Sequence, residues 1–309
     1  DHMISPDIIE AHQRISPYIR RTPVMLSNSD FCNHDTPLSL KLELFQHTGS
    51  FKPRGAFNNL LSRTVPEAGV TAASGGNHGA AVAFAAARLG HKARIFVPDI
   101  SSPAKQAKIR DAGAELVVTG AHYTDALARC EAYQQESGAL AVHAYDAAET
   151  IAGQGTIAVE WLDQTGPLDT LLVAVGGGGL ISGILAACGN QCQVVAVEPE
   201  GSACLNRAMT AGKPVDIEVN SVAADSLGAK SIGQLPYQIC RDLLSVFLTV
   251  PDAAIIAAQK AIWHKFQIVA EFGGATALAA LMHGVYRPKP GERVGVLLCG
   301  ANADLQQLI

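Results

Sequence analysis

The sequence carries little charge for its length, and the charge it has is not clustered. Of its 309 residues, 17% are charged and 48% are apolar, and the formal net charge is −5. No run of lysine and arginine is present, so we expect neither a nucleic acid nor an anionic membrane surface as a partner. No apolar run reaches the length of a membrane-spanning helix either.

Paired cysteines are also missing. The seven cysteines are odd in number and include no CxxC pair, and Cys188 and Cys192 lie nearest to each other. Because secreted disulfide frameworks normally pair their cysteines, we expect reduced thiols. With no signal peptide visible, the expected location is the cytoplasm. The histidines show no HExxH spacing, so a catalytic zinc site is not expected.

Short apolar runs alternate with longer helical patterns through much of the chain. Residues 69–74 and 170–175 predict strands, and each is followed by an apolar helical pattern, over 78–90 and 181–189. Strands separated by helices of this length are typical of parallel sheets with crossover helices. We therefore predict an α/β fold in which parallel sheets are flanked by helices.

The stretch SFKPRGA (50–56) places a lysine between a phenylalanine and a proline. One interpretation is a helix start, with Ser50 as the N-cap and Pro53 in the first turn. The other makes Lys52 a covalently reactive amine at a helix start, where an anion can bind. The stretch by itself leaves both interpretations open.

A run of four glycines, Gly176 to Gly179, lies between an apolar strand pattern and an apolar helix pattern. Successive backbone N–H groups there can converge on one anion at the helix start. Gly176, Gly178 and Gly183 do not keep the G-x-G-x-x-G spacing of a dinucleotide site. The run therefore predicts a single phosphate group as ligand, with a purely structural tight turn as the alternative.

Two further polar motifs follow predicted strands: SGGNHG (74–79) and CGAN (299–302). Exposed amides and short polar side chains at such junctions can hold a carboxylate, and α/β sheets bind ligands at the carboxyl ends of their strands. Taken singly, His78 is more often a capping or core histidine, and a lone buried cysteine such as Cys299 is usually inert packing.

Together and in this order, the four motifs resemble those of the fold-type II pyridoxal-phosphate enzymes, whose fold is tryptophan synthase β-like. The resemblance is strongest to the serine/threonine dehydratases and serine racemase, and it includes IAGQGT (151–156) and SACL (202–205). It implies a large domain (1–64 and 148–309), a small inserted domain (65–147), and pyridoxal 5'-phosphate in the cleft between them.

The resemblance also implies a role for individual residues. Lys52 would form the Schiff base with the cofactor and remove the substrate's α-proton, and Phe51 would pack against the pyridine ring. Asn77 would bind the phenolic oxygen of the ring, and Cys299 would face the ring nitrogen. The substrate carboxylate would lie against Ser74, Gly75, Asn77 and His78, and the phosphate against Gly176, Gly177, Gly178, Gly179 and Leu180.

The sequence departs from the family at three places. Serine racemase has a second serine at the position of Gly75, and glycine has no proton to give, which favours elimination over racemisation. The family's divalent-metal site would use Glu198, the Ser202 carbonyl and an acid at Cys204, but cysteine suits Mg²⁺ and Ca²⁺ poorly. A monovalent ion or no ion is therefore expected. ADSLG (224–228) also differs from the usual dehydratase loop over the cofactor.

The resemblance implies a dehydratase (ammonia-lyase) that converts an L-3-hydroxy amino acid such as threonine or serine to a 2-oxo acid and ammonia. The alternatives are a serine racemase, or a dehydratase for 3-hydroxyaspartate or an aryl-serine. From another class, a colourless phosphate-binding module is possible. A homodimer or higher homo-oligomer is expected. The exact substrate stays open.

Overall fold

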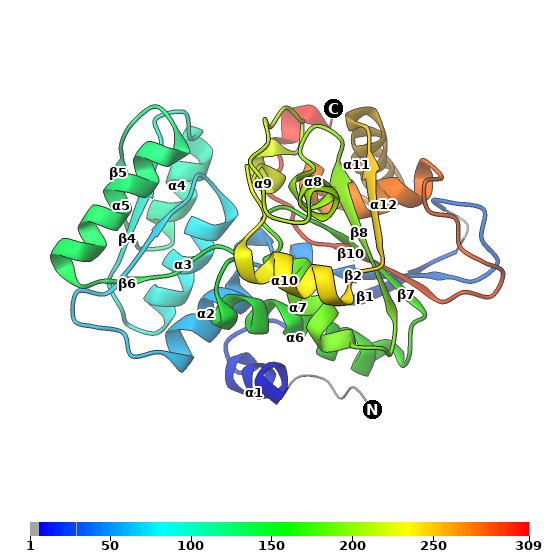
Figure 1. Cartoon of the computed structure of the whole chain (residues 1–309), viewed down its shortest axis with the longest axis horizontal. Coiled ribbons are helices and arrows are strands. Elements are labelled where there is room, and N and C mark those ends of the chain that lie inside the picture. Colours follow the sequence, from blue (N-terminus) through cyan, green and yellow to red (C-terminus); the bar gives the residue numbers. More distant parts are fainter. Residues whose placement is uncertain (1–5, 29, 309) are drawn as a thin grey trace.

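Two separate sheets organise the chain in the computed structural model, which describes residues 6–28 and 30–308 (Figure 1). The larger sheet has six strands, which are, in spatial order, β1 (Val24–Ser27), β2 (Leu38–Leu42), β10 (Val294–Leu298), β7 (Thr170–Ala174), β8 (Gln193–Pro199) and β9 (Val246–Val250). Its neighbours are parallel except for the antiparallel pair β1–β2. The smaller sheet is parallel throughout and consists of β5 (Glu115–Val118), β4 (Ala93–Val97), β3 (Val70–Ala73) and β6 (Leu140–Ala141).

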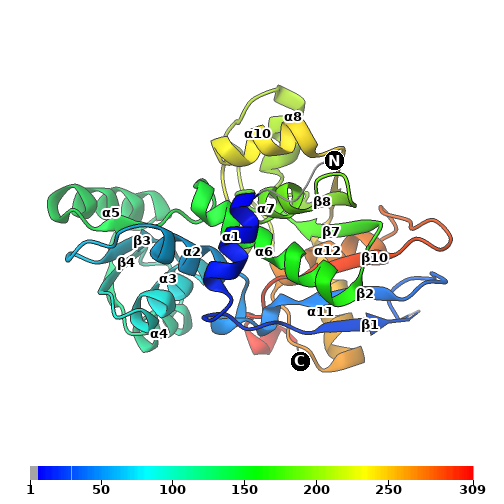
Figure 2. The same ribbon diagram turned by 90° about the horizontal axis from the view of Figure 1, so that it is seen from below.

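Helices cover both sheets. The smaller sheet is accompanied by α3 (Asn77–Arg88), α4 (Pro103–Asp111) and α5 (Tyr123–Ser137). Around the larger sheet, α6 (Ala148–Thr165) and α7 (Gly179–Cys188) lie on one side, and α11 (Asp252–Phe266) and α12 (Phe272–Met282) lie on the other (Figure 1). Figure 2 shows α1 (Pro6–Ile15) lying over α6 and α2 (Pro53–Ser62). The remaining helical segments are α8 (Cys204–Ala211), α9 (Ala224–Leu227), α10 (Gln234–Leu243), η1 (Glu43–Phe45), η2 (His47–Gly49) and η3 (Leu305–Gln307).

This architecture confirms the prediction of an α/β fold with parallel sheets flanked by helices. All four strands of the smaller sheet lie inside residues 65–147, for which an inserted domain is predicted. The boundaries of that domain stay a prediction. Among the described helices, none combines the length and the apolar character needed to cross a membrane.

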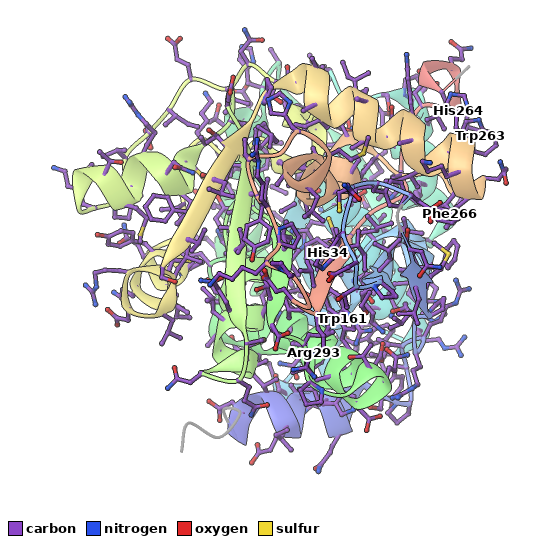
Figure 3. All side chains as sticks on the ribbon, turned by 90° about the vertical axis from the view of Figure 1, so that its right-hand side faces the viewer. His34, Trp161, Trp263, His264, Phe266 and Arg293 are labelled. Atoms are coloured by element: carbon purple, nitrogen blue, oxygen red, sulfur yellow. The ribbon has the colours of Figure 1, made fainter. Side chains whose placement is uncertain are left out.

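The core of the larger sheet is closed by Trp161 from α6, which is fully buried (Figure 3). Its indole N–H donates to the Ser39 hydroxyl at 2.9 Å, so the polar tip of the ring has a partner. A β-carbon at Gly295 would lie 2.5 Å from the indole, so β10 needs a glycine at this place. At the edge of the same core, the rings of Phe31 and Phe266 pack 5.5 Å apart.

Helix α6 fixes the positions of two other helices through its glycines. A β-carbon at Gly153 would lie 2.6 Å from the Arg54 carbonyl oxygen on α2, and one at Gly155 would lie 2.7 Å from the Gly183 carbonyl oxygen on α7. Such distances are far below van der Waals contact, so only glycine allows the backbones to approach this closely. Helix α6, which carries the IAGQGT motif, therefore packs closely against both α2, which follows Lys52, and α7, which begins at the glycine run.

A buried cluster of charges holds the start of α2. Arg54 donates to Glu43 at 3.0 Å and to Glu160 at 2.9 Å, and Lys41 pairs with Glu160. All four side chains are at most 3% exposed. Two positive and two negative charges balance, which a cluster removed from water requires. The backbone at Arg54, two residues after Lys52, is therefore fixed by a charge cluster that includes side chains from β2, η1 and α6.

Candidate active site

Three of the four motifs meet at Lys52. The Phe51 N–H donates to the Cys299 carbonyl at 3.1 Å, and Ser50 forms a β-bridge with Gly300. The Lys52 ammonium donates to the Ala144 carbonyl at 3.1 Å, beside the tyrosine that covers the glycine run. Segments that are more than 200 residues apart in sequence thus surround one amine.

The predicted N-cap role of Ser50 is wrong. Helix α2 begins at Pro53, its N-cap residue is Lys52, and no side chain caps it. The Ser50 hydroxyl accepts only a long bond, 3.4 Å, from the Lys52 N–H, because the β-bridge to Gly300 holds Ser50 in extended backbone. Pro53 does occupy the first helical position, as predicted.

The side chain of Lys52 is half-buried. Its burial lowers its pKa from 10.5 to about 8, although Cys299 and Glu271 act in the opposite direction. At pH 7 about a tenth of the amines would then be unprotonated, against fewer than roughly one in a thousand for an ordinary lysine. The site therefore holds a lysine that can act as a nucleophile or a base near neutral pH.

The glycine run forms a cradle of hydrogen-bond donors at the start of α7. None of the N–H groups of Gly177, Gly178, Gly179 and Leu180 has a hydrogen-bond partner among the described residues, and no side chain caps the helix. Gly178 adopts a left-handed conformation with φ 98°, and its β-carbon would lie 2.5 Å from Ile232. A β-carbon at Gly177 would overlap the Tyr145 ring. Free amides at a helix start attract an anion.

Cys299 directly follows β10 and is a neutral group. The thiol is 4% exposed and donates to the Gly273 carbonyl at 3.7 Å. Burial raises its pKa to about 12, so it carries no charge near neutral pH. A neutral partner at this place cannot force a proton onto a nearby ring nitrogen as a carboxylate would.

The segment from Ser74 to His78 joins β3 to α3 and exposes polar backbone. The Ser74 hydroxyl accepts from the Gly76 N–H at 3.1 Å, and Ser101 donates to the Gly75 carbonyl at 3.1 Å. The His78 ring is hydrogen-bonded to the Val142 carbonyl at 2.8 Å, and burial lowers its pKa to about 3. His78 is therefore a neutral side chain with a fixed ring.

Asn77 connects this segment to Glu271, the N-cap residue of α12, and to Asn302, which follows β10. Its amide N–H donates to Glu271 at 2.8 Å, and its oxygen accepts from Asn302 at 2.6 Å. One amide proton of Asn77 stays free for a ligand, because the NH₂ group has two. Glu271 is 6% exposed, and burial raises its pKa while the bond from Asn77 acts against that rise.

A family model described as "Pyridoxal-phosphate dependent enzyme" matches residues 15–300. The chain belongs to this family. Phenylserine dehydratase from Ralstonia pickettii is 39% identical over 298 residues, which cover 94% of this chain and 90% of the relative. Maize serine racemase superposes with a TM-score of 0.93 at 33% identity, covering 100% of this chain and 96% of that one. A threonine deaminase from T.th. gives 0.90 at 35%, covering 97% and 98%.

The family identified from the four motifs is thus confirmed, and the cofactor is pyridoxal 5'-phosphate. The residues present fit it. The free amides of the glycine run could take a phosphate, the Lys52 amine could bond to a carbonyl carbon, and the free proton of Asn77 could meet an oxygen anion. Phe51 adds an aromatic face, with its ring centre 5.2 Å from the Lys52 nitrogen.

Sequence reasoning missed Glu271 and Tyr145. Glu271 precedes a Gly-Gly pair in AEFGGA, and nothing in that stretch indicates a buried carboxylate facing Asn77. Tyr145 lies four residues after the end of β6, in the segment that leads to α6. A tyrosine after a short strand carries no signal for a ring that covers a glycine run.

At Glu198, the position of the family's metal site, hydrogen bonds within the protein satisfy the carboxylate. This carboxylate is fully buried, and its oxygens accept from the N–H groups of Leu205 and Asn206, at 2.7 and 2.9 Å, and from the Asn206 amide at 2.6 Å. The Cys204 thiol donates to the Gly176 carbonyl at 3.2 Å. Within residues 6–28 and 30–308 no group of three acidic, histidine or cysteine side chains could hold a metal. Helix α8 and Asn206 thus supply three hydrogen bonds to Glu198, with which a bound ion would have to compete.

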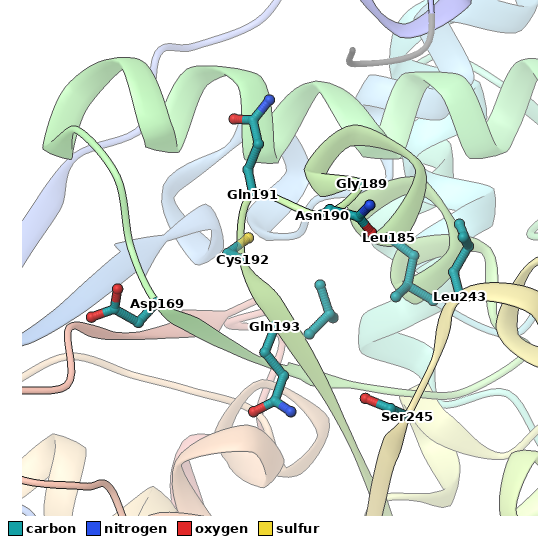
Figure 4. A pocket seen from close by; sticks show the side chains of 10 residues that line it. Asp169, Leu185, Gly189, Asn190, Gln191, Cys192, Gln193, Leu243 and Ser245 are labelled. Carbon is teal, nitrogen blue, oxygen red and sulfur yellow. The ribbon is translucent and has the colours of Figure 1, made fainter. Parts of the chain in front are cut away.

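A cavity of about 400 Å³ lies at the other end of α7 (Figure 4). Asp169 and Gln193 at the amino ends of β7 and β8 line it, together with Cys192 and Ser245. Parallel sheets bind ligands at the carboxyl ends of their strands, which is the opposite edge. The cavity has no part in the site around Lys52.

Proposed function

We propose that the protein is a pyridoxal-phosphate-dependent dehydratase, which removes water and then ammonia from an L-3-hydroxy amino acid. The observation that carries most weight is the desolvated amine of Lys52 beside the neutral thiol of Cys299. The names of the relatives, phenylserine dehydratase and threonine deaminase, support this class of reaction.

In this proposal Lys52 has two tasks. Its amine would hold the cofactor covalently, and when free it would remove the α-proton of the substrate. The bound cofactor supplies a conjugated ring that stabilises negative charge at the α-carbon. A pKa of about 8 suits a base that must be partly unprotonated at neutral pH and still hold the proton it takes.

The other residues orient the reactants. The amides of Gly75, Asn77 and His78 would hold the carboxylate, so that the α-proton lies toward Lys52. The Ser74 and Gly76 amides already donate within the protein. Asn77 binds the ring oxygen with its free proton while Glu271 fixes its amide group. Cys299, as a neutral thiol, would not force a proton onto the ring nitrogen, and a ring without that proton would stabilise negative charge at the α-carbon less. Prompt loss of the hydroxyl is then favoured over other fates of that charge.

Elimination is favoured over racemisation because of Gly75. Racemisation needs a second proton donor on the opposite face of the α-carbon, and glycine has none. The β-hydroxyl leaves as water, and the enamine product hydrolyses to a 2-oxo acid and ammonia. The required hydroxyl is present in threonine, serine, an aryl-serine and 3-hydroxyaspartate. An assay of all four amino acids is therefore needed to identify the substrate.

Reduction with borohydride followed by peptide mapping tests the covalent part of the proposal. Treated protein should carry one pyridoxyl group, located on Lys52, and should lose its visible absorption. Labelling of another lysine would contradict the assignment of Lys52. A colourless protein that takes up no label would favour the phosphate-binding module instead.

Three further expectations are part of the proposal. We infer a homodimer or higher homo-oligomer, which sedimentation equilibrium would test, and a reducing, cytoplasmic location on the grounds of the unpaired cysteine pattern. We also infer that residues 65–147 move as one inserted domain over the substrate. Slower hydrogen exchange at the facing loops after substrate addition would support that movement.

A further inference from the structure

A cavity of about 480 Å³ adjoins the candidate active site. It lies between the first turn of α4, in the part of the chain that carries the smaller sheet, and the short helix α9. Two of its lining residues, Glu271 and Asn302, are the hydrogen-bond partners of Asn77. The cavity is therefore next to the segment that is proposed to bind the substrate carboxylate, and these two side chains lie between them.

One positive side chain lines this cavity among its described residues, and it is Lys105. The side chain is 25% exposed, and its nitrogen would lie 3.9 Å from a β-carbon built on Gly76. Gly76 is the uncapped N-cap residue of α3 and the centre of the carboxylate segment. The ammonium group is thus held beside backbone that can donate hydrogen bonds to a carboxylate but carries no charge of its own.

Lys105 is held there by an ion pair with Asp225 of α9. An ammonium group has three protons, so Asp225 can keep one of them while a ligand oxygen takes another. The other acidic lining residues, Glu271 and Asp304, would repel an anion in the cavity. A carboxylate entering here has Lys105 as its favourable charge.

We propose that Lys105 binds the α-carboxylate of the amino-acid substrate. The loop amides orient the carboxylate by hydrogen bonds, and the Lys105 ammonium group balances its negative charge. This inference rests on the proposed function, because it takes an amino acid bound at Lys52 as the ligand. The rival explanation is mechanical: the pair Lys105–Asp225 fastens α4 to α9 and touches no substrate.

Binding of L-alanine and L-alaninamide to the holoenzyme separates the two explanations. Neither ligand has a hydroxyl to lose, and they differ in the carboxylate, so the change of the visible absorption band reports binding alone. In Lys105→Gln, the preference for L-alanine over L-alaninamide should fall about 10- to 100-fold relative to wild type, as for a lost charge-assisted hydrogen bond. Asp225→Asn, which breaks the same ion pair but keeps the cation, should retain the preference.

Arg110→Gln is the matched control, because Arg110 is an exposed cation on the same helix. It should also retain the preference. Equal weakening of both ligands in Lys105→Gln would overturn the proposal, and so would an equal loss of preference in Asp225→Asn. A wild-type protein without the visible band would refute the proposed function and this inference with it, whereas a normal band with an unchanged preference would refute this inference alone.

Discussion

Replacing Lys52 by methionine should stabilise the cofactor-free protein, although it removes the residue on which the proposed activity depends. Methionine has a similar length and no charge to desolvate. The folded state lowers the Lys52 pKa from 10.5 to about 8. Since one pKa unit is worth about 1.4 kcal/mol, the buried charge costs roughly 3 kcal/mol of folding free energy at pH 7.

The stability that Lys52→Met gains over the wild type should depend on pH. Below about pH 8, Lys52 is protonated in both the folded and the unfolded state, and the cost is fully present. Between about 8 and 10.5 the unfolded state binds the proton more tightly, so the stability of the wild type rises with pH. The difference between Lys52→Met and wild type should therefore be largest at pH 7 and vanish near pH 10.5.

Urea unfolding of both cofactor-free proteins at pH 7, 9 and 10.5, followed by circular dichroism, measures this difference. Lys260→Met is the control, because Lys260 is exposed on α11, and it should change the free energy of unfolding by less than about 0.5 kcal/mol. A variant no more stable than wild type at pH 7 would refute the reasoning. So would a gain that is the same at all three pH values, since Lys52 would then not be desolvated.

Three other substitutions test separate parts of the site. Gly177→Val should weaken cofactor binding more than tenfold and lower the melting temperature by an amount equivalent to about 1–3 kcal/mol, because its side chain overlaps Tyr145; unchanged affinity by equilibrium dialysis would make the glycine run a simple turn. Gly75→Ser should add measurable D-serine formation from L-serine, since a β-carbon there meets nothing closer than Ser101 at 3.7 Å; chiral chromatography that detects only the parent's products would count against the second-face argument. Cys204→Asp should make the melting temperature rise with Mg²⁺ or Ca²⁺, because a second carboxylate joins Glu198, while the wild type should respond to neither the ions nor EDTA; a cation-dependent wild type would contradict the absence of a divalent site.

The sequence predicted the features that depend on local pattern. Alternating strands and helices predict a parallel α/β fold, because the spacing of the apolar residues in each segment shows which face of that strand or helix is buried. The glycine run, SFKPRGA, SGGNHG and CGAN could be found because each combines a strand or helix boundary with residue types that have a chemical reason to be there. Three of these motifs lie at the ends of strands, and the topology of parallel sheets then brings them together.

Features that depend on contacts across the fold could not be predicted. Whether Ser50 caps α2 depends on its β-bridge to Gly300, which lies 250 residues away in sequence. The surroundings of Glu271 and Lys105 are formed by segments that are distant in sequence, and no pattern in the sequence links those segments. The family's divalent-metal site could be questioned from Cys204 alone, but the hydrogen bonds that Leu205 and Asn206 donate to Glu198 could be seen only in the structure.

The central claim is tested most directly by the products formed from a panel of L-3-hydroxy amino acids. Purified protein is incubated with L-threonine, L-serine, L-phenylserine and L-threo-3-hydroxyaspartate, and the oxo acid, ammonia and D-isomer are quantified for wild type and Lys52→Ala. At least one substrate should give oxo acid and ammonia in equal amounts with little D-isomer, and Lys52→Ala should lower the rate by several orders of magnitude. D-serine formed as fast as pyruvate, or oxo acid formed equally well by Lys52→Ala, would contradict the account.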